Sequence, residues 1–290
     1  MHYLAIGHVC KDITPDGWTF GGTVTFAGRT ARAIGCETHV ITSTGPDVDP
    51  RVALPDIDVI SSPADRTTTF ENRYMPTGRQ QLLHNTANRL DPHLVNALGP
   101  IHKTLDVVHL APIAQELDRA WLDQFAGDFV GITPQGWLRQ WDAAGNVSRA
   151  EWQEAESILR RTTAAVISIE DVRGDESLAR QWSKWARVFV VTRGAAGCSV
   201  YYDGVITDLP TAKETEVDPT GAGDVFAAAF FVRLKQTASP IAAARFANCL
   251  ATKSISRPGL DGIPTHNEIQ LCLSTSPLIE AKYPLASASR

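Results

Sequence analysis

The chain has 290 residues, 43% of them hydrophobic, which is enough to bury the core of one large α/β domain. Its formal net charge is −5 with both signs interspersed, so no basic tract is available for nucleic acid, and no apolar run approaches the ~18 residues of a membrane span. The five cysteines are scattered without a CxxC pair, which favours buried free thiols over a disulfide or zinc framework. No signal-peptide pattern opens the sequence, and together these features predict a cytoplasmic protein.

The first predicted strand covers 3–9 and leads directly into Asp12. An acidic residue just beyond the carboxyl end of a core strand lies at the edge of an α/β sheet where ligands bind. Asp12 can therefore accept hydrogen bonds from the hydroxyls of a substrate. The alternative is a loop carboxylate that only water contacts.

A glycine pair, Gly21 and Gly22, stands next to Thr23 at a predicted strand-to-helix turn. Because glycine has no Cβ, this pair allows the backbone to approach a ligand closely. The helix is expected over 24–34, and Gly35 follows it as the type of residue that ends helices in a left-handed conformation.

Residues 66–85 carry β-forming residues on both sides of a Pro-Thr-Gly turn and predict a β-hairpin with mostly polar faces. With the strand near 18–20, this hairpin is expected to form a small sheet apart from the main one. Glu71, Asn72 and Arg79 either reach a substrate from this sheet or are solvated, and the sequence leaves both alternatives open.

The other core strands are near-continuous apolar runs that alternate with helical segments, which predicts a mainly parallel sheet covered on both faces. These strands are expected at 39–43, within 52–60, and at 105–110, 129–132, 164–169 and 188–192, with a hairpin over 198–208. Further helices are expected at 152–160, 176–185, 225–235 and 241–256.

Polar residues follow two of these strands at the ligand-binding edge of the sheet. Gln135 and Arg139 follow one strand and are candidate contacts to substrate or phosphate, although a surface salt bridge is the alternative for Arg139. Glu170 and Asp171 follow the other strand, where the alternative to a ligand role is an acidic cap on the next helix.

The most informative stretch is a glycine-rich turn at the start of a predicted helix, made of Gly221, Ala222, Gly223 and Asp224. The free amides and the dipole of a helix N-terminus favour an anion, so the four amides of this turn can cradle a phosphate. Asp224 at the mouth of the cradle would repel a static phosphate, but it can accept a proton from an attacking hydroxyl. An anion hole beside a carboxylate base is what a small-molecule kinase requires. The alternative is a turn in which Asp224 only caps the helix.

The run DPTGAGDVF at 218–226 resembles the second signature motif of the PfkB carbohydrate kinases, a family of the ribokinase-like superfamily whose usual motif is DTxGAGDxF. Pro219 stands where Thr is common. The resemblance implies that Asp224 is the catalytic base and that the three residues before it form the anion hole with its amide. It also implies that Asp218 and Thr220 are candidate ligands of a monovalent cation such as K⁺.

Four further stretches match the same family, so the resemblance covers almost the whole chain. It implies a ribokinase-like three-layer α/β/α sandwich with a mainly parallel central sheet and a small β-sheet lid. The chain would then be a single kinase domain, 1–290, with lid strands from about 13–22 and 66–85. A lid matters to a kinase because water competes with the substrate as nucleophile. An exposed lid edge can pair with a second copy, which makes a homodimer through the lid a candidate assembly.

The nucleotide side of the resemblance rests on the run TRGAAG at 192–197, which matches the Thr-x-Gly-x-x-Gly loop of the family. Its two glycines would admit a nucleotide against the backbone. Asn248 corresponds to a position near the adenine pocket of the family, and Gly259 to the loop beside the nucleotide and the cation. The expected nucleotide-binding residues are Thr192, Gly194, Gly197, Asn248 and Gly259.

Many members of the family carry Asn-x-x-Glu where this chain has Ser168-x-x-Asp171, with Glu170 alongside. In the family the Glu acts on the phosphates through Mg²⁺ and water. Asp171 keeps a carboxylate at that spacing, so the resemblance implies that Mg²⁺ associates with Asp171 and Glu170. Oxygen ligands with several retained waters suit this ion.

The glycine pair matches the first signature motif of the family, which closes over the sugar, but the usual Asn is missing from the run 23–27. This departure argues against ribose-like or fructose-like substrates. Three features look most like plant-type myo-inositol kinases: VDPTGAGD, the Thr-Thr-x-Phe-Glu of the hairpin, and the missing Asn. The resemblance therefore implies a phosphotransferase that uses ATP and Mg²⁺ to phosphorylate a hydroxyl of a small sugar or polyol, with myo-inositol or a related cyclitol foremost. The expected substrate contacts are Asp12, Gly21, Gly22, Thr23, Glu71, Arg79, Gln135 and Arg139.

Two other functions stay open at this point. A kinase for nucleosides or hydroxymethylpyrimidine-type rings would stack its substrate on aromatic side chains, and Trp18, Phe20 and Phe26 are available. A non-catalytic ligand-binding protein on a kinase fold would be expected to lack Asp224 or the glycines of its turn, and both are present.

Overall fold

The computed structural model describes residues 1–75 and 78–275, with the backbone alone at 74, 75, 78 and 79. Its centre is a nine-stranded sheet in the order β15-β14-β13-β12-β9-β8-β1-β4-β5. The strands are β1 (His2–Ile6), β4 (Glu37–Thr44), β5 (Asp58–Pro63), β8 (Leu105–Leu110), β9 (Val130–Ile132), β12 (Ala164–Ser168), β13 (Val188–Thr192), β14 (Cys198–Tyr202) and β15 (Val205–Leu209). Neighbouring strands from β13 to β5 run parallel, whereas β14 is antiparallel to both β13 and β15. The mainly parallel sheet expected from the sequence is confirmed.

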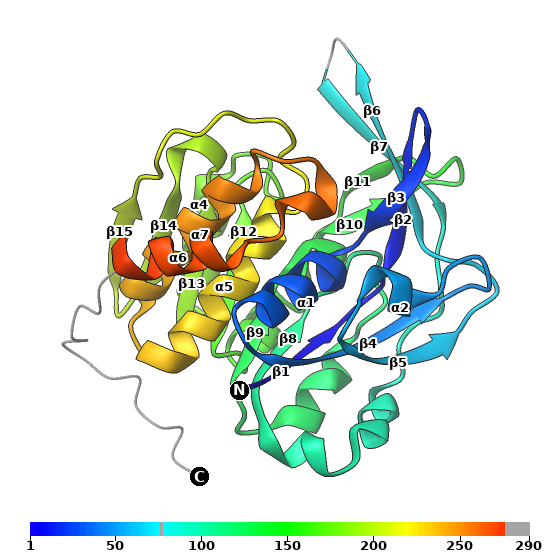
Figure 1. The fold of residues 1–290 in the computed structure, drawn as a ribbon, viewed down its shortest axis with the longest axis horizontal. Coiled ribbons are helices and arrows are strands. Elements are labelled where there is room, and N and C mark those ends of the chain that lie inside the picture. The colour runs from blue at the N-terminus through cyan, green and yellow to red at the C-terminus, as the bar shows by residue number, and fades with distance from the viewer. Residues whose placement is uncertain (76–77, 276–290) are drawn as a thin grey trace.

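Helices cover both faces of this sheet, because its strands are apolar on both sides. Along β1, Tyr3 and Ala5 face one core cluster while Leu4 and Ile6 face the other. The first cluster is covered by α1 (Thr23–Ala33), α5 (Ala222–Thr237), α6 (Pro240–Ser254) and α7 (His266–Thr275), which lie on the near side in Figure 1. The second is covered by the 3₁₀ segments η1 (Pro92–Thr104) and η2 (Arg119–Phe125), with α3 (Ala155–Leu159) and α4 (Glu176–Ser183). The three-layer α/β/α sandwich is therefore confirmed.

A second sheet of four strands, in the order β3-β2-β6-β7, lies beside the carboxyl ends of β1 and β4 (Figure 1). Its strands are β2 (Cys10–Thr14), β3 (Gly17–Gly21), β6 (Thr69–Met75) and β7 (Gly78–Asn85). The hairpin begins at Thr69, later than expected, because the hydroxyls of Thr67 and Thr68 accept hydrogen bonds from the amides of Gly45 and Ala87. A short hairpin, β10 (Arg139–Trp141) and β11 (Val147–Arg149), pairs with β7 through Leu82 and Asn146 and was not anticipated.

Other boundaries differ from expectation for identifiable reasons. β1 ends at Ile6. The amide of Gly7 still donates to the carbonyl of Ile41, but the amides of His8 and Val9 bond to the side chains of Glu116 and Thr42. Within 52–60 the chain does form a strand, β5, and a short helix precedes it. That helix is α2 (Pro50–Ala53), which begins with a proline and is capped by the carboxylate of Asp49. The remaining 3₁₀ turns are η3 (Pro134–Leu138), η4 (Gly194–Ala196) and η5 (Gly259–Gly262).

The expectation of five free thiols is wrong for two of them. Cys249 on α6 and Cys272 on α7 form a disulfide, while Cys10, Cys36 and Cys198 are free and buried as expected. The spacing of the pair gave no signal, because the two cysteines meet only through the packing of α7 on α6. No helix in the described part of the chain is both long and apolar enough to cross a membrane.

Candidate active site

The glycine-rich turn forms the start of α5, as expected. Gly221 is the residue before the helix and has φ 79° and ψ −5°, a left-handed conformation that glycine adopts readily. A Cβ atom at Gly221 would lie 2.1 Å from Cδ1 of Phe26. At Gly223, by contrast, a Cβ atom would meet nothing within 4 Å, so the space beside this residue is open.

The amides of this turn are not all available to a ligand. That of Ala222 donates to the carbonyl of Pro219 (3.2 Å), and that of Asp224 donates to the carbonyl of Gly221 (3.0 Å). Within the described residues the amide of Gly223 meets no acceptor, and it faces the open space at the N-terminus of a 16-residue helix. An anion placed there would also benefit from the dipole of α5.

Asp224 is the most perturbed carboxyl of this region. Burial raises its pKa to about 7, and the charges of Asp171 and Asp12 act in the same direction. A hydrogen bond from the side chain of Thr23 and the charge of Arg139 act to lower this pKa. A carboxyl group with a pKa near 7 is well matched to accepting a proton at neutral pH.

Asp12 lies on β2 opposite Thr19, and its carboxylate reaches along the strand to Gly21 at the end of β3. A Cβ atom at Gly21 would be 2.1 Å from Oδ2 of Asp12, and one at Gly22, where φ is 91°, would be 2.2 Å from the carbonyl oxygen of His8. Both glycines are therefore required by close contacts within the protein. These contacts bring the carboxylate of Asp12 to the start of α1, near Asp224.

Arg139 supplies positive charge to the same region. Its guanidinium lies over the ring of Phe70, 5.1 Å from the centroid, and Nη1 donates to the carbonyl of Ile113 (3.1 Å). Its charge acts on both Asp224 and Cys10. The arginine is thus held beside Phe70 of the small sheet, and its charge reaches Asp224 in the glycine-rich turn.

Asp171 follows β12 and faces the same site. Its Oδ2 accepts from the amide of Ser168 (3.0 Å) and its Oδ1 from Nε2 of Gln135 (3.3 Å). The structure therefore brings Gln135 to Asp171, and Asp171 close enough to raise the pKa of Asp224. The neighbouring carboxylates of Asp171 and Asp224 suit a Mg²⁺ ion, which prefers oxygen ligands and retains water. Glu170 is exposed, so the stronger candidate of the acidic pair is Asp171.

The residues expected to bind nucleotide are mostly engaged in contacts within the protein. Thr192 ends β13 and its hydroxyl donates to the carbonyl of Ile167 (3.3 Å). The side-chain amide of the buried Asn248 donates to the carbonyl oxygen of Leu209 (3.1 Å). A Cβ atom at Gly197 would lie 2.1 Å from the same oxygen. Gly194 has φ 53° and open space around it.

The candidate cation ligands Asp218 and Thr220 lie in the segment just before α5. Oδ1 of Asp218 accepts from the amide of Thr220 (2.9 Å), and Oδ2 accepts from the amide of Gly259 (2.8 Å). Burial acts to raise the pKa of Asp218, but the hydrogen bonds from Thr220 and Gly259 outweigh it and hold this pKa below its usual value. Asp218 therefore stays ionised and joins the segment before α5 to the loop after α6.

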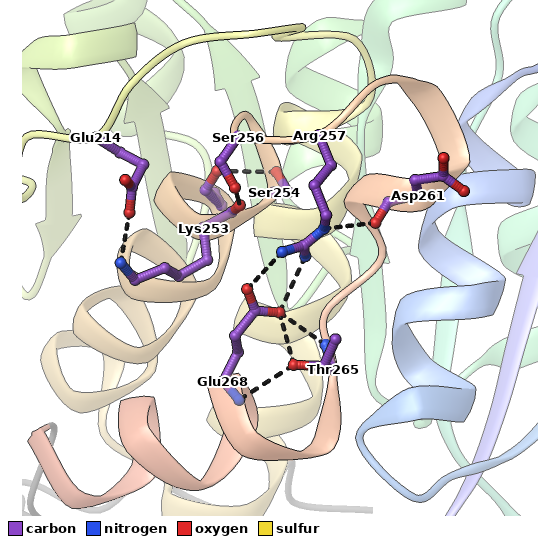
Figure 2. A network of polar contacts seen from close by, with 9 residues as sticks. Glu214, Lys253, Ser254, Ser256, Arg257, Asp261, Thr265 and Glu268 are labelled. Atoms are coloured by element: carbon purple, nitrogen blue, oxygen red, sulfur yellow. Dashed lines mark hydrogen bonds and ion pairs between the residues drawn. The ribbon is translucent and has the colours of Figure 1, made fainter.

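A polar network fixes the chain around this loop (Figure 2). Lys253 pairs with Glu214, and the guanidinium of Arg257 pairs with both carboxylate oxygens of Glu268 at 2.7 and 3.0 Å. Neither of these basic residues is exposed to solvent without a partner. Instead, they tie the segment before the catalytic turn to α6 and the start of α7.

Two of the expected hairpin contacts have partners within the hairpin itself. Glu71 pairs with Arg73 (2.7 Å) and His84 (2.8 Å) within the hairpin, and Asn72 accepts from Gln81 (3.0 Å). Arg79 lies in β7, but its side chain is outside the described part of the chain.

One residue of the site was missed from the sequence. Glu116 is 2% exposed, and its carboxylate accepts from the amides of His8 (3.0 Å), Ile113 (3.0 Å) and Ala114 (2.7 Å). It therefore fixes the chain after β1 and after β8, beside Cys10 and Arg139. A single acidic residue inside the apolar run 107–117 was the available signal.

Comparison with known proteins points to one family. The model of the pfkB family of carbohydrate kinases matches residues 153–266, which include Asp171, the loop at 192–197 and the catalytic turn. The chain is 27% identical over 257 residues to a cytidine kinase of Thermococcus kodakarensis, covering 79% of this chain and 87% of that protein. It is 25% identical over 287 residues to an inositol 3-kinase of Zea mays, covering 89% and 73%.

The fold is shared with solved kinases of the ribokinase family. A pyrophosphate-dependent kinase of this family, in complex with a pyrophosphate analog and myo-inositol, superposes with a TM-score of 0.78 at 22% identity, covering 93% of this chain and 100% of that one. The family match, the kinase relatives along most of the chain and the carboxylate at the start of α5 agree with one another. Residues 153–266 therefore match the pfkB family of carbohydrate kinases, and over most of its length the chain is similar to kinases.

Proposed function

We propose that this protein phosphorylates a hydroxyl of a small polyol, with myo-inositol or a related cyclitol as the leading substrate and ATP as the donor. The observation that carries this proposal is the carboxyl group of Asp224. It has a pKa near 7, stands in the first turn of α5 and is surrounded by Asp12, Arg139 and Asp171. A hydroxyl acceptor and a phosphoryl donor can meet at this point.

In the proposed reaction, Asp12 and Arg139 orient the polyol with one hydroxyl toward Asp224. The carboxylate of Asp224 takes the proton of this hydroxyl. At the same time the hydroxyl oxygen bonds to the γ-phosphorus, and the bond between that phosphorus and the leaving oxygen of ADP breaks. The amide of Gly223 and the dipole of α5 stabilise the charge that develops on the transferred group. Mg²⁺ near Asp171, when bound, would neutralise charge on the donor phosphates.

We further propose that the four-stranded sheet acts as the lid of the single domain and excludes water during transfer. Its exposed side chains include Ile13 and Trp18, on β2 and the edge strand β3. An apolar lid edge of this kind supports a homodimer. K⁺ at Asp218 and Thr220, nucleotide contacts from the loop at 192–197, and a cytoplasmic location belong to the same proposal.

The substrate is the least constrained part of the proposal. The inositol 3-kinase relative and the solved kinase with bound myo-inositol support a cyclitol. The cytidine kinase relative supports the nucleoside alternative, as does the edge-to-face pair of Trp18 and Phe20, whose ring centroids are 5.1 Å apart. Trp18 is 44% exposed and lies under the ammonium of Lys11, where it could stack on a base.

Pyrophosphate is the second candidate donor. The solved structure that contains a pyrophosphate analog matches this chain over 93% of its length. In addition, Asn248, the residue expected at the adenine, donates its amide to Leu209 inside the protein. A small donor would need only the anion site at α5 and the metal.

The test is a matrix of phosphoryl donors and acceptors. Purified protein with Mg²⁺ is given ATP or pyrophosphate and, separately, myo-inositol, other cyclitols, ribose, fructose, cytidine, adenosine or hydroxymethylpyrimidine, and phosphorylated product is measured. Product from a cyclitol supports the leading proposal, and product from cytidine alone would replace the polyol by a nucleoside. Donor binding without product from any acceptor would favour the non-catalytic alternative.

A further inference from the structure

Two histidines and a glutamate come together at the start of the central strands, away from the residues discussed so far. His2 opens β1, and its register partner on β4 is Glu37. His39 is two residues further along β4, so it shares a face with Glu37. The candidate catalytic residues follow the carboxyl ends of the strands, whereas this cluster lies at their amino ends.

The spacing of the three side chains matches a metal site. Nδ1 of His2 is 3.4 Å from Nε2 of His39 and 3.8 Å from Oε2 of Glu37, and one ligand atom from each residue lies within 4.8 Å of the others. Two nitrogen ligands about 2.05 Å from one tetrahedral zinc ion are themselves about 3.3 Å apart. The two imidazoles therefore need almost no movement, and the exposed carboxylate of Glu37 needs a small one.

The orientation of His39 strengthens this argument. Its imidazole is 1% exposed, and Nδ1 lies 3.3 Å from Oδ2 of Asp58, its register partner on β5. A proton on Nδ1 shared with this carboxylate leaves the lone pair of Nε2 directed at His2. Metal-binding histidines are commonly held by a carboxylate in this way. The rings of the two histidines stack with an interplanar angle of 21°, and the amide of His2 is held by Asp106 (2.9 Å).

We propose that His2 Nδ1, His39 Nε2 and Glu37 Oε2 form a binding site for a divalent transition-metal ion, with Zn²⁺ as the best fit. Two imidazoles and one carboxylate suit Zn²⁺ better than Mg²⁺ or Ca²⁺, which prefer oxygen ligands. The ion would replace the proton that His2 and His39 otherwise share. Because Glu37 and His2 are partly exposed, water can fill the fourth position.

Such an ion would join β1 to β4 at the first residues of both strands. Since a metal bound only by the folded state stabilises that state, the expected consequence is greater thermal stability. The site is separate from the proposed Mg²⁺ position at Asp171 and does not depend on the kinase proposal.

The experiment uses the full chain without a histidine tag, stripped of metal by a chelator and kept in Mg²⁺. Zn²⁺ is titrated in competition with a chromophoric chelator, and thermal melting is followed with and without Zn²⁺. We expect one equivalent of tightly bound Zn²⁺ and an increase in Tm. Glu37→Gln and His2→Ala should each weaken binding at least about 10-fold, and Asp58→Asn about 10- to 100-fold. His93→Ala, an exposed histidine outside the cluster, is the matched control and should bind as the parent does.

Cobalt provides a second readout that separates this site from the buried thiols. Co²⁺ bound by nitrogen and oxygen gives visible bands without the near-ultraviolet charge-transfer band of a thiolate ligand. The visible bands should disappear in Glu37→Gln. The side chain of Glu37 is exposed, so this substitution should not disturb folding, and loss of the bands would report loss of the metal ligand. A Zn²⁺ affinity no better than about 1 mM would overturn the proposal. So would tight binding that both Glu37→Gln and His2→Ala leave unchanged, or a thiolate band in the cobalt spectrum.

Discussion

The side chain of Thr23, the first residue of α1, forms a hydrogen bond with the carboxylate of Asp224 in the first turn of α5. The threonine itself is buried, with 3% of its surface exposed. This bond favours the ionised carboxylate, while burial of Asp224 favours the protonated form and prevails. Thr23 is one of the expected substrate contacts, and from this position it also limits how far the pKa of Asp224 rises.

Replacement of the base is the first prediction. Asp224→Asn keeps the size of the side chain and a hydrogen-bond acceptor for Thr23, but it cannot take a proton. Because positioned general bases contribute about 10²- to 10⁴-fold, we expect a loss of kcat of at least about 100-fold with donor affinity nearly unchanged. Single-turnover kinetics and equilibrium binding of the donor measure the two effects. Turnover equal to that of the parent would exclude Asp224 as the base.

Thermal stability checks that this variant is folded. The pKa of Asp224 in the folded state, about 7, lies above its ordinary value, so the parent loses stability as pH rises from about 4 to about 7. Asn does not ionise and escapes this loss. Relative to the parent, Asp224→Asn should therefore show a higher Tm at pH 8 and no such gain at pH 4.

The pH dependence of catalysis is the second prediction. The base must be ionised, so kcat/KM should fall as pH drops below about 7 and level off above it. Thr23→Val removes a hydrogen bond that lowers the pKa of Asp224, which should move this acidic limb to higher pH. The profile is obtained from initial rates at subsaturating acceptor between pH 5 and 9.

Thr30→Val is the matched control for this substitution. Thr30 lies on the same helix and is fully buried, and its hydroxyl has no hydrogen-bond partner within the described residues. It should leave the acidic limb in place. An identical shift in both variants would show that the effect comes from helix α1 as a whole and not from the bond to Asp224.

The two glycines of the catalytic turn should respond differently to alanine. At Gly223 the new methyl group enters open space and meets no protein atom, so Gly223→Ala should fold normally but obstruct the donor. We expect its KM for the donor to rise at least about 10-fold, equivalent to roughly 1.4 kcal/mol of binding. Steady-state kinetics with the donor varied give this value.

Gly221→Ala should instead act on folding. The residue has φ 79°, and its Cβ would overlap the ring of Phe26, so strain and overpacking together should cost about 2 kcal/mol or more. Thermal or urea unfolding distinguishes the pair. If Gly223→Ala were the less stable variant, or bound the donor as the parent does, the open space beside Gly223 would not be the donor site.

Asp171 is the basis of the fourth prediction. Asp171→Asn keeps the size of the side chain and its acceptor for the Ser168 amide, but it removes the charge that suits Mg²⁺. We expect the Mg²⁺ concentration for half-maximal rate to rise by about 10-fold or more. Glu156→Gln, which changes an exposed carboxylate paired with Arg160 on the surface, is the control and should leave the Mg²⁺ titration unchanged.

The disulfide gives the fifth prediction. Cys249 and Cys272 close a loop with a sequence separation of 23, so the cross-link should stabilise the folded state by about 3 kcal/mol in a chain-entropy estimate. Reduction of the protein, or the double variant Cys249→Ser/Cys272→Ser, should lower Tm by several degrees. Cys36→Ser, which removes a free buried thiol, is the control, and its Tm should still fall on reduction. Loss of this fall in Cys36→Ser would show that Cys36, and not the disulfide, is responsible.

The sequence by itself determined the resemblance to the PfkB carbohydrate kinases, the three-layer sandwich and the place of Asp224 at the start of a helix. Apolar runs that face both core clusters specify strands buried on two sides, as at Tyr3 and Leu4. The turn before α5 could be interpreted because glycine adopts the left-handed backbone of Gly221 readily and the residues after it continue as a helix. Such signals are local, so they can be interpreted without knowledge of the rest of the fold.

Only the tertiary structure decided which partners these residues find. The bond from Thr23 to Asp224, the disulfide of Cys249 and Cys272 and the three amides that Glu116 binds all join segments or loops whose proximity depends on packing. The same holds for Gly21, whose missing Cβ makes room for the carboxylate of Asp12. Distances of this kind depend on how helices and sheets pack, and they cannot be predicted from the spacing of the residues along the chain.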